Sequence, residues 1–185
     1  MPIFEKETFR FRQYEVQSIG GLCCGISLAL LTELAENHHD QNLRFSATNA
    51  FHYAREFSKM IKVSKNMIMS QTLPGFTAFR QRIFNLQTRN ESKKFNEVKN
   101  KSVRGAVLLK LSVGPVEPRQ NAGSAFKTWD WDYAQNHMGL AVFEGNGDVF
   151  VFDPNCGGVL VNWQSDAYLP TPVEVVDSVL LRMYR

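Results

Sequence analysis

The residue best suited to nucleophilic chemistry is Cys23, in the glycine-rich segment Gly20-Gly21-Leu22-Cys23-Cys24-Gly25-Ile26-Ser27. An apolar run typical of a buried helix follows, so this cysteine is expected at a helix N-terminus. The positive end of the helix dipole and the unpaired N–H groups there lower a thiol's pKa and favour the thiolate. The glycines would let a substrate approach the sulfur. Free cysteines are also commonly buried, so a purely structural thiol is the alternative.

A base for this thiol is expected from a hairpin later in the chain. His137 opens an apolar strand pattern and Asp153 ends the next one, with Gly145-Asn146-Gly147-Asp148 as the turn between them. With a bulge or stagger, the two side chains meet at the same end of the ribbon. The imidazole would deprotonate Cys23, and the carboxylate would fix its tautomer and stabilise the imidazolium. These residues predict a Cys-His-Asp triad.

Three further residues are candidates for contacting a substrate. Gln17, six residues before Cys23, and the backbone N–H of Cys23 are suited to stabilising an oxyanion, although an exposed loop amide is an equal reading of Gln17. Trp129 and Trp131 precede the His137 strand and could hold a substrate side chain at the rim of a cleft. Packing against the sheet is the alternative for both tryptophans.

The elements that must position these residues fall into two parts, which predicts an α+β domain. Helical patterns run from Cys23 to Glu36, from about Ser46 to Ile61 and, less regularly, over Phe76–Leu86, and a polar, lysine-rich loop follows from Gln87 to Arg104. The predicted strands are Ala106–Val113, His137–Glu144, Val149–Phe152, Val159–Trp163 and Ser178–Tyr184. We therefore expect one domain over residues 1–185, with a helical layer (about 1–104) packed on a C-terminal antiparallel sheet (about 105–185).

Composition excludes several classes of protein. The chain has 185 residues, 44% of them hydrophobic, which is enough for a core without disulfides or metals. The net charge of +3 is too small and too evenly spread to predict nucleic acid as a partner. Three cysteines, two of them adjacent, predict free thiols and a reducing compartment. Neither a cleaved secretory signal nor an integral membrane segment is expected.

The three motifs together resemble a known family. The block around Cys23, the strand led by His137 and Phe152-Asp153-Pro154-Asn155-Cys156-Gly157 resemble the Cys, His and Asp blocks of the YopT/AvrPphB-like cysteine proteases, which are papain-fold effectors that bacteria deliver into other cells. The resemblance implies a papain-like fold with Cys23 as nucleophile, His137 as general base and acid, and Asp153 as orienting carboxylate. Gln17 matches the oxyanion glutamine of papain-like enzymes. Cys24 leaves the register open, and Cys23 is preferred because it places Gly25 and Ser27 as in the family.

The expected function is that of a secreted bacterial effector or toxin, a cysteine protease without cofactor or metal. Its partners would be a protein or peptide substrate in the target cell and a secretion apparatus component or chaperone. It would be secreted without a cleaved signal peptide and act in the host or target-cell cytoplasm. Two alternatives stay open: an NlpC-type cell-wall peptide amidase or a deamidase or acyltransferase toxin on the same fold, and a catalytically silent effector that binds a host protein.

Overall fold

The computed structural model describes residues 4–16, 22–37, 46–65, 67, 99, 102–111, 137–145, 147–164 and 167–184. Within these ranges the elements are β1 (Phe4–Arg10), α1 (Gln13–Val16), α2 (Cys23–Asn37), α3 (Ala47–Met60), β2 (Arg104–Leu111), β3 (His137–Glu144), β4 (Asp148–Asp153), β5 (Gly157–Asn162) and α6 (Pro172–Met183). None of the helices in this part of the chain is long and apolar enough to cross a membrane.

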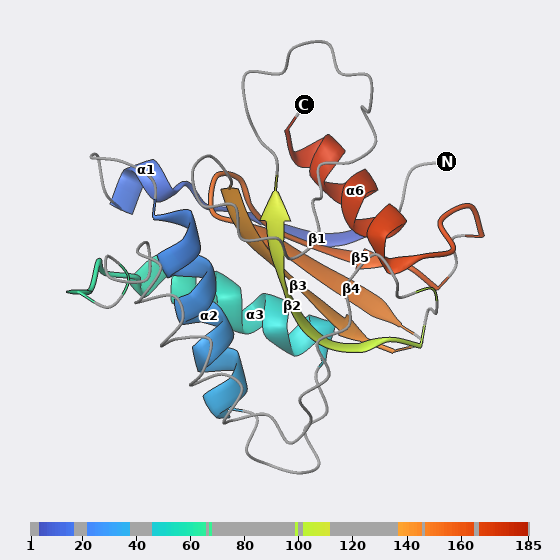
Figure 1. Ribbon diagram of the computed structural model, residues 1–185, viewed down its shortest axis with the longest axis horizontal. Helices are drawn as coiled ribbons and strands as arrows, with labels where there is room; N and C mark the ends of the chain where they lie inside the picture. The colour runs from blue at the N-terminus through green and yellow to red at the C-terminus, as the bar shows by residue number, and fades with distance from the viewer. Residues whose placement is uncertain are drawn as a thin grey trace.

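The strands form one antiparallel sheet that lies between two helical layers. Its strand order is β1-β5-β4-β3-β2, so β1 pairs with β5 at one edge and β2 pairs with β3 at the other. Helices α2 and α3 lie on one side of the sheet and α6 lies on the other (Figure 1). Both faces of the sheet are therefore covered by helices along most of the central strands.

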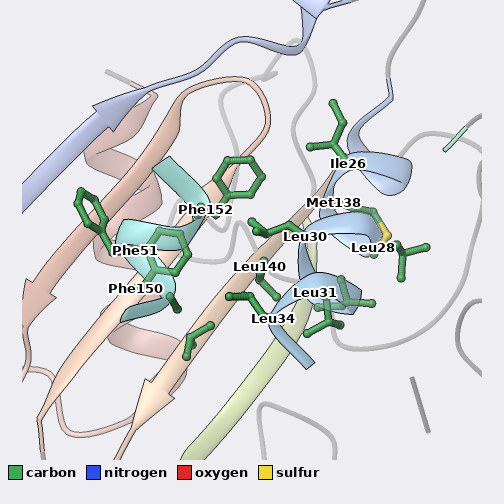
Figure 2. Close-up of a cluster of buried hydrophobic side chains, with 14 of the residues drawn as sticks. Ile26, Leu28, Leu30, Leu31, Leu34, Phe51, Met138, Leu140, Phe150 and Phe152 are labelled. Atoms are coloured by element: carbon green, nitrogen blue, oxygen red, sulfur yellow. The ribbon is translucent and has the colours of Figure 1, made fainter. Parts of the chain in front are cut away.

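The alternation of side chains along the central strands supplies a separate core to each layer. The core under α2 and α3, drawn in Figure 2, contains Ile26, Leu28, Leu30, Leu31 and Leu34 of α2, Phe51 of α3, and Met138, Leu140, Phe150 and Phe152 of the sheet. The core under α6 contains the odd-numbered residues of β3 and β4, whose side chains point to the other face of the sheet: Ala141, Phe143, Val149 and Val151. They pack with Val175, Val176, Val179 and Leu180 of α6. Each strand of the central hairpin is thus buried on both faces.

The α+β class, the antiparallel sheet, the two N-terminal helices and the first four predicted strands are confirmed. The predicted helix over 76–86 and nearly all of the predicted loop over 87–104 lie outside the described residues. The predicted division into helices followed by strands is incomplete, because β1 precedes the helices. Over residues 5–10 of β1 only Phe9 is partly buried and the other side chains are exposed, so this edge strand lacks the regular alternation that predicts a strand.

The predicted strand over 178–184 is wrong, because this segment belongs to α6 and its C-cap. Thr171 and Glu174 form a reciprocal capping box, and Pro172 occupies the first turn. The buried residues of α6 recur at helical spacing and pack on the sheet in the second core. The capping box that marks the start of the helix lies several residues before the segment predicted as a strand. The apolar residues of that segment alone are compatible with either a strand or a helix.

Gly157 allows the turn between β4 and β5 to form, and its replacement should be costly. Its φ is +122°, and an added Cβ would overlap the carbonyl oxygen of Phe9 on β1. We expect Gly157→Ala to lower the free energy of unfolding by about 3 kcal/mol through backbone strain and overpacking together. Urea unfolding followed by circular dichroism measures the change.

Gly105 provides the matched control for this substitution. Its φ of +126° is nearly the same, but nothing lies within 4 Å of an added Cβ. Gly105→Ala should therefore show the strain alone, about 1 kcal/mol. Equal losses for the two variants would contradict the role of close packing between β1 and the turn.

Candidate active site

Cys23 is the first residue of α2, and two contacts fix the start of this helix against the sheet. The Ser27 hydroxyl donates a hydrogen bond of 3.1 Å to the backbone oxygen of Met138, next to His137 on β3. Gly25 lies against the backbone of Met67, where an added Cβ would overlap the Met67 carbonyl. The glycine and serine of this motif therefore seat the helix, and the expected role of Gly25 in admitting a substrate is replaced by a packing role.

His137 and Asp153 are neighbours on one face of the sheet. Leu140 pairs with Phe152, so Asp153 lies one step further along, beside Gly139 and diagonally across from His137. The His137 Nε2 atom is 2.6 Å from the Asp153 Oδ1 atom. The side chains of both residues are buried, with 7% of His137 and 0% of Asp153 exposed. Of the two expected arrangements, a bulge or a stagger, the stagger occurs: the register offsets His137 and Asp153 by two residues, and the paired residues of β3 and β4 run without a bulge.

The thiol of Cys23 completes the contact on the other side of the ring. With Nε2 engaged by Asp153, Nδ1 is the ring nitrogen left to face Cys23, and the two side chains lie close enough for His137 to act on the thiol through hydrogen bonding and charge. Burial acts to raise the pKa of Cys23, but the hydrogen bond and charge of His137 and the backbone groups of Met138 and Cys24 outweigh it, so the pKa is lowered. A thiolate beside an imidazolium is therefore the favoured state.

His137 is shifted in the complementary direction. Burial acts to lower the pKa of His137, but the hydrogen bond to Asp153 and then the hydrogen bond to Cys23 outweigh it and raise the pKa to about 9. The imidazole consequently stays protonated across neutral pH, and its charge favours the thiolate form of Cys23. This arrangement can deliver a nucleophile and hold a proton for a leaving group.

The other two cysteines lack this activation. Burial and then the neighbouring Cys23 raise the pKa of Cys24 to about 12. Burial and then the charge of Asp153 raise the pKa of Cys156 to about 11, against smaller opposing effects of Tyr184 and Arg12. All three cysteines are free thiols. The electrostatics of the site thus favour Cys23 over Cys24 as the reactive thiol.

Alkylation should distinguish the three thiols directly. At pH 7 we expect iodoacetamide to modify Cys23 at least about 100-fold faster than Cys24 or Cys156, because attack follows the thiolate fraction. Peptide mapping by mass spectrometry after short exposures measures the three rates. Faster modification of Cys24 or Cys156 would move the reactive position away from Cys23.

Three residues that the sequence analysis did not assign to the site also surround it. The Tyr184 hydroxyl donates to the Asp153 Oδ2 atom at 2.7 Å, and the Asn155 backbone N–H donates to Oδ1 at 2.7 Å. Gln13 is buried and its Oε1 atom accepts from the Leu22 N–H at 2.7 Å, directly before the nucleophile. Asn155 lies within the motif that carries Asp153. Tyr184 is missed because its segment is predicted as a strand. Gln13 is missed because it lies in a polar N-terminal arm that shows no motif.

Three residues named from the sequence, Gln17, Trp129 and Trp131, lie outside the described residues. Their assignments to the oxyanion hole and to substrate binding therefore stay predictions. Of the residues named for catalysis, the structure brings Cys23, His137 and Asp153 together at one end of the sheet.

No family model, no curated protein and no solved structure matches the chain.

Proposed function

We propose that this chain is a papain-like thiol hydrolase, a cysteine protease that cleaves a target-cell protein through Cys23, His137 and Asp153. The observation that carries the proposal is the buried pair of His137 and Asp153, 2.6 Å apart, with Cys23 at the start of α2 close enough to His137 for the two groups to shift each other's pKa. The opposite pKa shifts of the thiol and the imidazole are those that a thiolate–imidazolium pair requires.

Acylation begins with attack of the Cys23 thiolate on the carbonyl carbon of a peptide bond. The carbon–sulfur bond forms, and the carbonyl π electrons move to the oxygen to give a tetrahedral oxyanion. The oxyanion then collapses, the carbon–nitrogen bond breaks, and the proton on His137 Nδ1 passes to the leaving amine. The products of this half-reaction are an acyl-thioester on Cys23 and a neutral imidazole.

Deacylation uses the same groups in the reverse roles. Neutral His137 takes a proton from water as the oxygen attacks the thioester carbonyl, and the second oxyanion expels the Cys23 thiolate. The carboxylic acid product leaves and the imidazolium is restored. Asp153 holds the ring with Nε2 engaged throughout, so that Nδ1 always faces the sulfur.

The fold and the motifs support a papain-like layout and an effector role. A nucleophile at a helix start that abuts the end of an antiparallel sheet, with the residues in the chain order Cys, His, Asp, agrees with the resemblance to the YopT/AvrPphB-like proteases. The free thiols suit a reducing target-cell cytoplasm. We therefore propose secretion without a cleaved signal, a protein or peptide substrate in the target cell, and delivery by a secretion apparatus component or chaperone.

A substrate-independent screen tests the proposal. Purified protein is incubated with a peptide library made from a bacterial and a eukaryotic proteome and, in parallel, with purified peptidoglycan, and new N-termini and released peptides are identified by mass spectrometry. We expect new N-termini in both libraries with the wild-type chain and none with Cys23→Ala. Conversion of glutamine to glutamate without chain cleavage, release of peptides from peptidoglycan alone, or no reaction at all would replace the protease with the deamidase, the amidase or the silent binding protein.

A further inference from the structure

Helix α6 reaches the candidate site from the side of the sheet opposite to α2. Odd-numbered residues of β3 and β4 face α6. His137 and Asp153 are also odd-numbered and lie at the same end of the two strands. Tyr184, the C-cap residue of α6, is therefore brought to Asp153, where its hydroxyl donates to Oδ2 at 2.7 Å. The backbone N–H of Tyr184 is itself held by the Leu180 carbonyl at 3.1 Å, which fixes the end of the helix.

The Asp153 carboxylate is hydrogen-bonded on both oxygens. Oδ1 accepts from the Asn155 backbone N–H and contacts His137, and Oδ2 accepts from Tyr184. With the side chain 0% exposed, these groups take the place of water around the charge. Because Tyr184 is the partner on Oδ2, it determines the rotation of the carboxylate about its Cβ–Cγ bond, and so the direction in which Oδ1 points at the ring.

Tyr184 is also part of a longer chain of hydrogen bonds that returns to the nucleophile. Its oxygen accepts from Asn155 Nδ2 at 3.2 Å, and Asn155 Oδ1 accepts from Gln13 Nε2. Gln13 Oε1 in turn accepts from the N–H of Leu22, the residue before Cys23. The side-chain roles are unambiguous, because the Leu22 N–H can only donate and therefore fixes which way the Gln13 amide points.

We propose that Tyr184 is a positioning residue for the proposed triad, which acts through Asp153 to hold the His137 ring in its working orientation. This inference rests on the proposed function and extends the site to a helix on the far side of the sheet. It assigns to α6 a role in activity beyond covering the second core.

The charges around Tyr184 keep its hydroxyl a donor. Burial and the neighbouring Asp153 charge raise its pKa far above the ordinary value, so it stays protonated. The other titratable groups nearby are Cys156, whose charge acts to raise the pKa of Tyr184, and Arg12, which acts to lower the pKa of Cys156. Because Cys156 keeps its proton at neutral pH, Asp153 is the negatively charged group to which the Tyr184 hydroxyl donates.

Tyr184→Phe removes only the hydroxyl and tests the inference. With 41% of the Tyr184 residue exposed, the loss of one oxygen should leave α6 folded. Without a donor on Oδ2, the carboxylate aligns less well with His137 and raises the pKa of the ring less. We expect the His137 titration midpoint, followed by NMR, to fall by about one pH unit, and kcat on a peptide from the screen to fall about tenfold with KM within about twofold.

Tyr168→Phe is the matched control, because Tyr168 is 74% exposed and is not hydrogen-bonded to Asp153. It should leave the midpoint and kcat at the wild-type values. For Tyr184→Phe, an unchanged or higher midpoint would overturn the inference, as would a loss of kcat that only follows a loss of folded protein.

The wild-type titration separates this test from the test of the proposed function. A His137 midpoint near the ordinary histidine value in the wild-type chain would argue against the thiolate–imidazolium pair itself. A raised midpoint that Tyr184→Phe does not lower would leave the pair standing and remove only the role of Tyr184.

Discussion

Replacing Cys23 with alanine is expected to lower peptide hydrolysis by at least about 10⁴-fold, to the background of the assay. The sulfur forms the covalent intermediate, so no other group of the triad can substitute for it. The residue is partly buried in the first turn of α2, where alanine is a good helix former. The free energy of unfolding should therefore change by less than about 1 kcal/mol.

Cys24→Ala is the matched control, since it removes a thiol of the same size one residue further along. Its thiol, with a pKa raised to about 12, supplies almost no thiolate at neutral pH. The variant should keep hydrolysis within a few-fold of wild type while losing about 1 kcal/mol of stability from the core. Loss of activity in Cys24→Ala with retention in Cys23→Ala would reverse the assignment of the nucleophile.

The hairpin that carries His137 and Asp153 was predictable because its information is local. The Gly145 turn and the two apolar strands fix the pairing, and the pairing fixes which side chains share a face. The number of residues on each side of the turn does not fix the register, so the sequence leaves a bulge and a stagger as alternatives, and the pairing of β3 with β4 is the staggered one. One register error would have placed the imidazole and the carboxylate on opposite faces.

The contact between Cys23 and His137 could not be derived in the same way, since 137 − 23 = 114 residues separate them. It depends on how α2 packs against β3, through its apolar face and the hydrogen bond of Ser27 to Met138. Periodicity predicts that α2 has a buried face, but it does not predict which strand that face meets. The order and content of the three motifs, compared with a known family, supplied that link.

Tyr184 shows how an error in one element hides a residue of the site. As a strand, residues 178–184 would have extended the sheet and left no reason to place Tyr184 near Asp153. As a helix capped by Thr171 and Glu174, the same segment crosses the sheet and ends at the carboxylate. The capping pair was present in the sequence, and it is the signal that would have corrected the assignment.

Replacing Asp153 is the second substitution with a large expected effect, and it should affect both activity and folding. Asp153→Ala removes the acceptor of three hydrogen bonds from His137, Asn155 and Tyr184 in a fully buried position. We expect hydrolysis to fall about 10⁴-fold and the free energy of unfolding to fall by about 3 kcal/mol. Kinetics on a peptide from the screen and urea unfolding measure the two quantities.

Asp153→Asn separates the charge of this residue from its shape. The amide keeps the volume and one acceptor, and the Tyr184 hydroxyl can rotate to accept from the new NH₂ group, so the loss of stability should be smaller, about 1 kcal/mol. Hydrolysis should fall, but by less than in Asp153→Ala, because the amide oxygen still orients the ring while the charge that stabilises the imidazolium is lost. An asparagine variant as active as wild type would show that the carboxylate charge is not used.

The pH dependence of stability gives an independent measure of the same charge. In the folded chain the pKa of His137 is raised to about 9, from an ordinary value of 6.5. A histidine whose pKa is raised by folding contributes stability that is fully present below its unfolded value and is lost as the pH rises through its folded value. The difference in unfolding free energy between wild type and Asp153→Asn should therefore be largest below about pH 6.5, shrink as the pH rises from there to about 9, and stay at its smallest value above that. A difference that stays constant from pH 6 to 10 would mean that Asp153 holds a neutral ring, in which case the thiolate–imidazolium pair at Cys23 would lose its electrostatic basis.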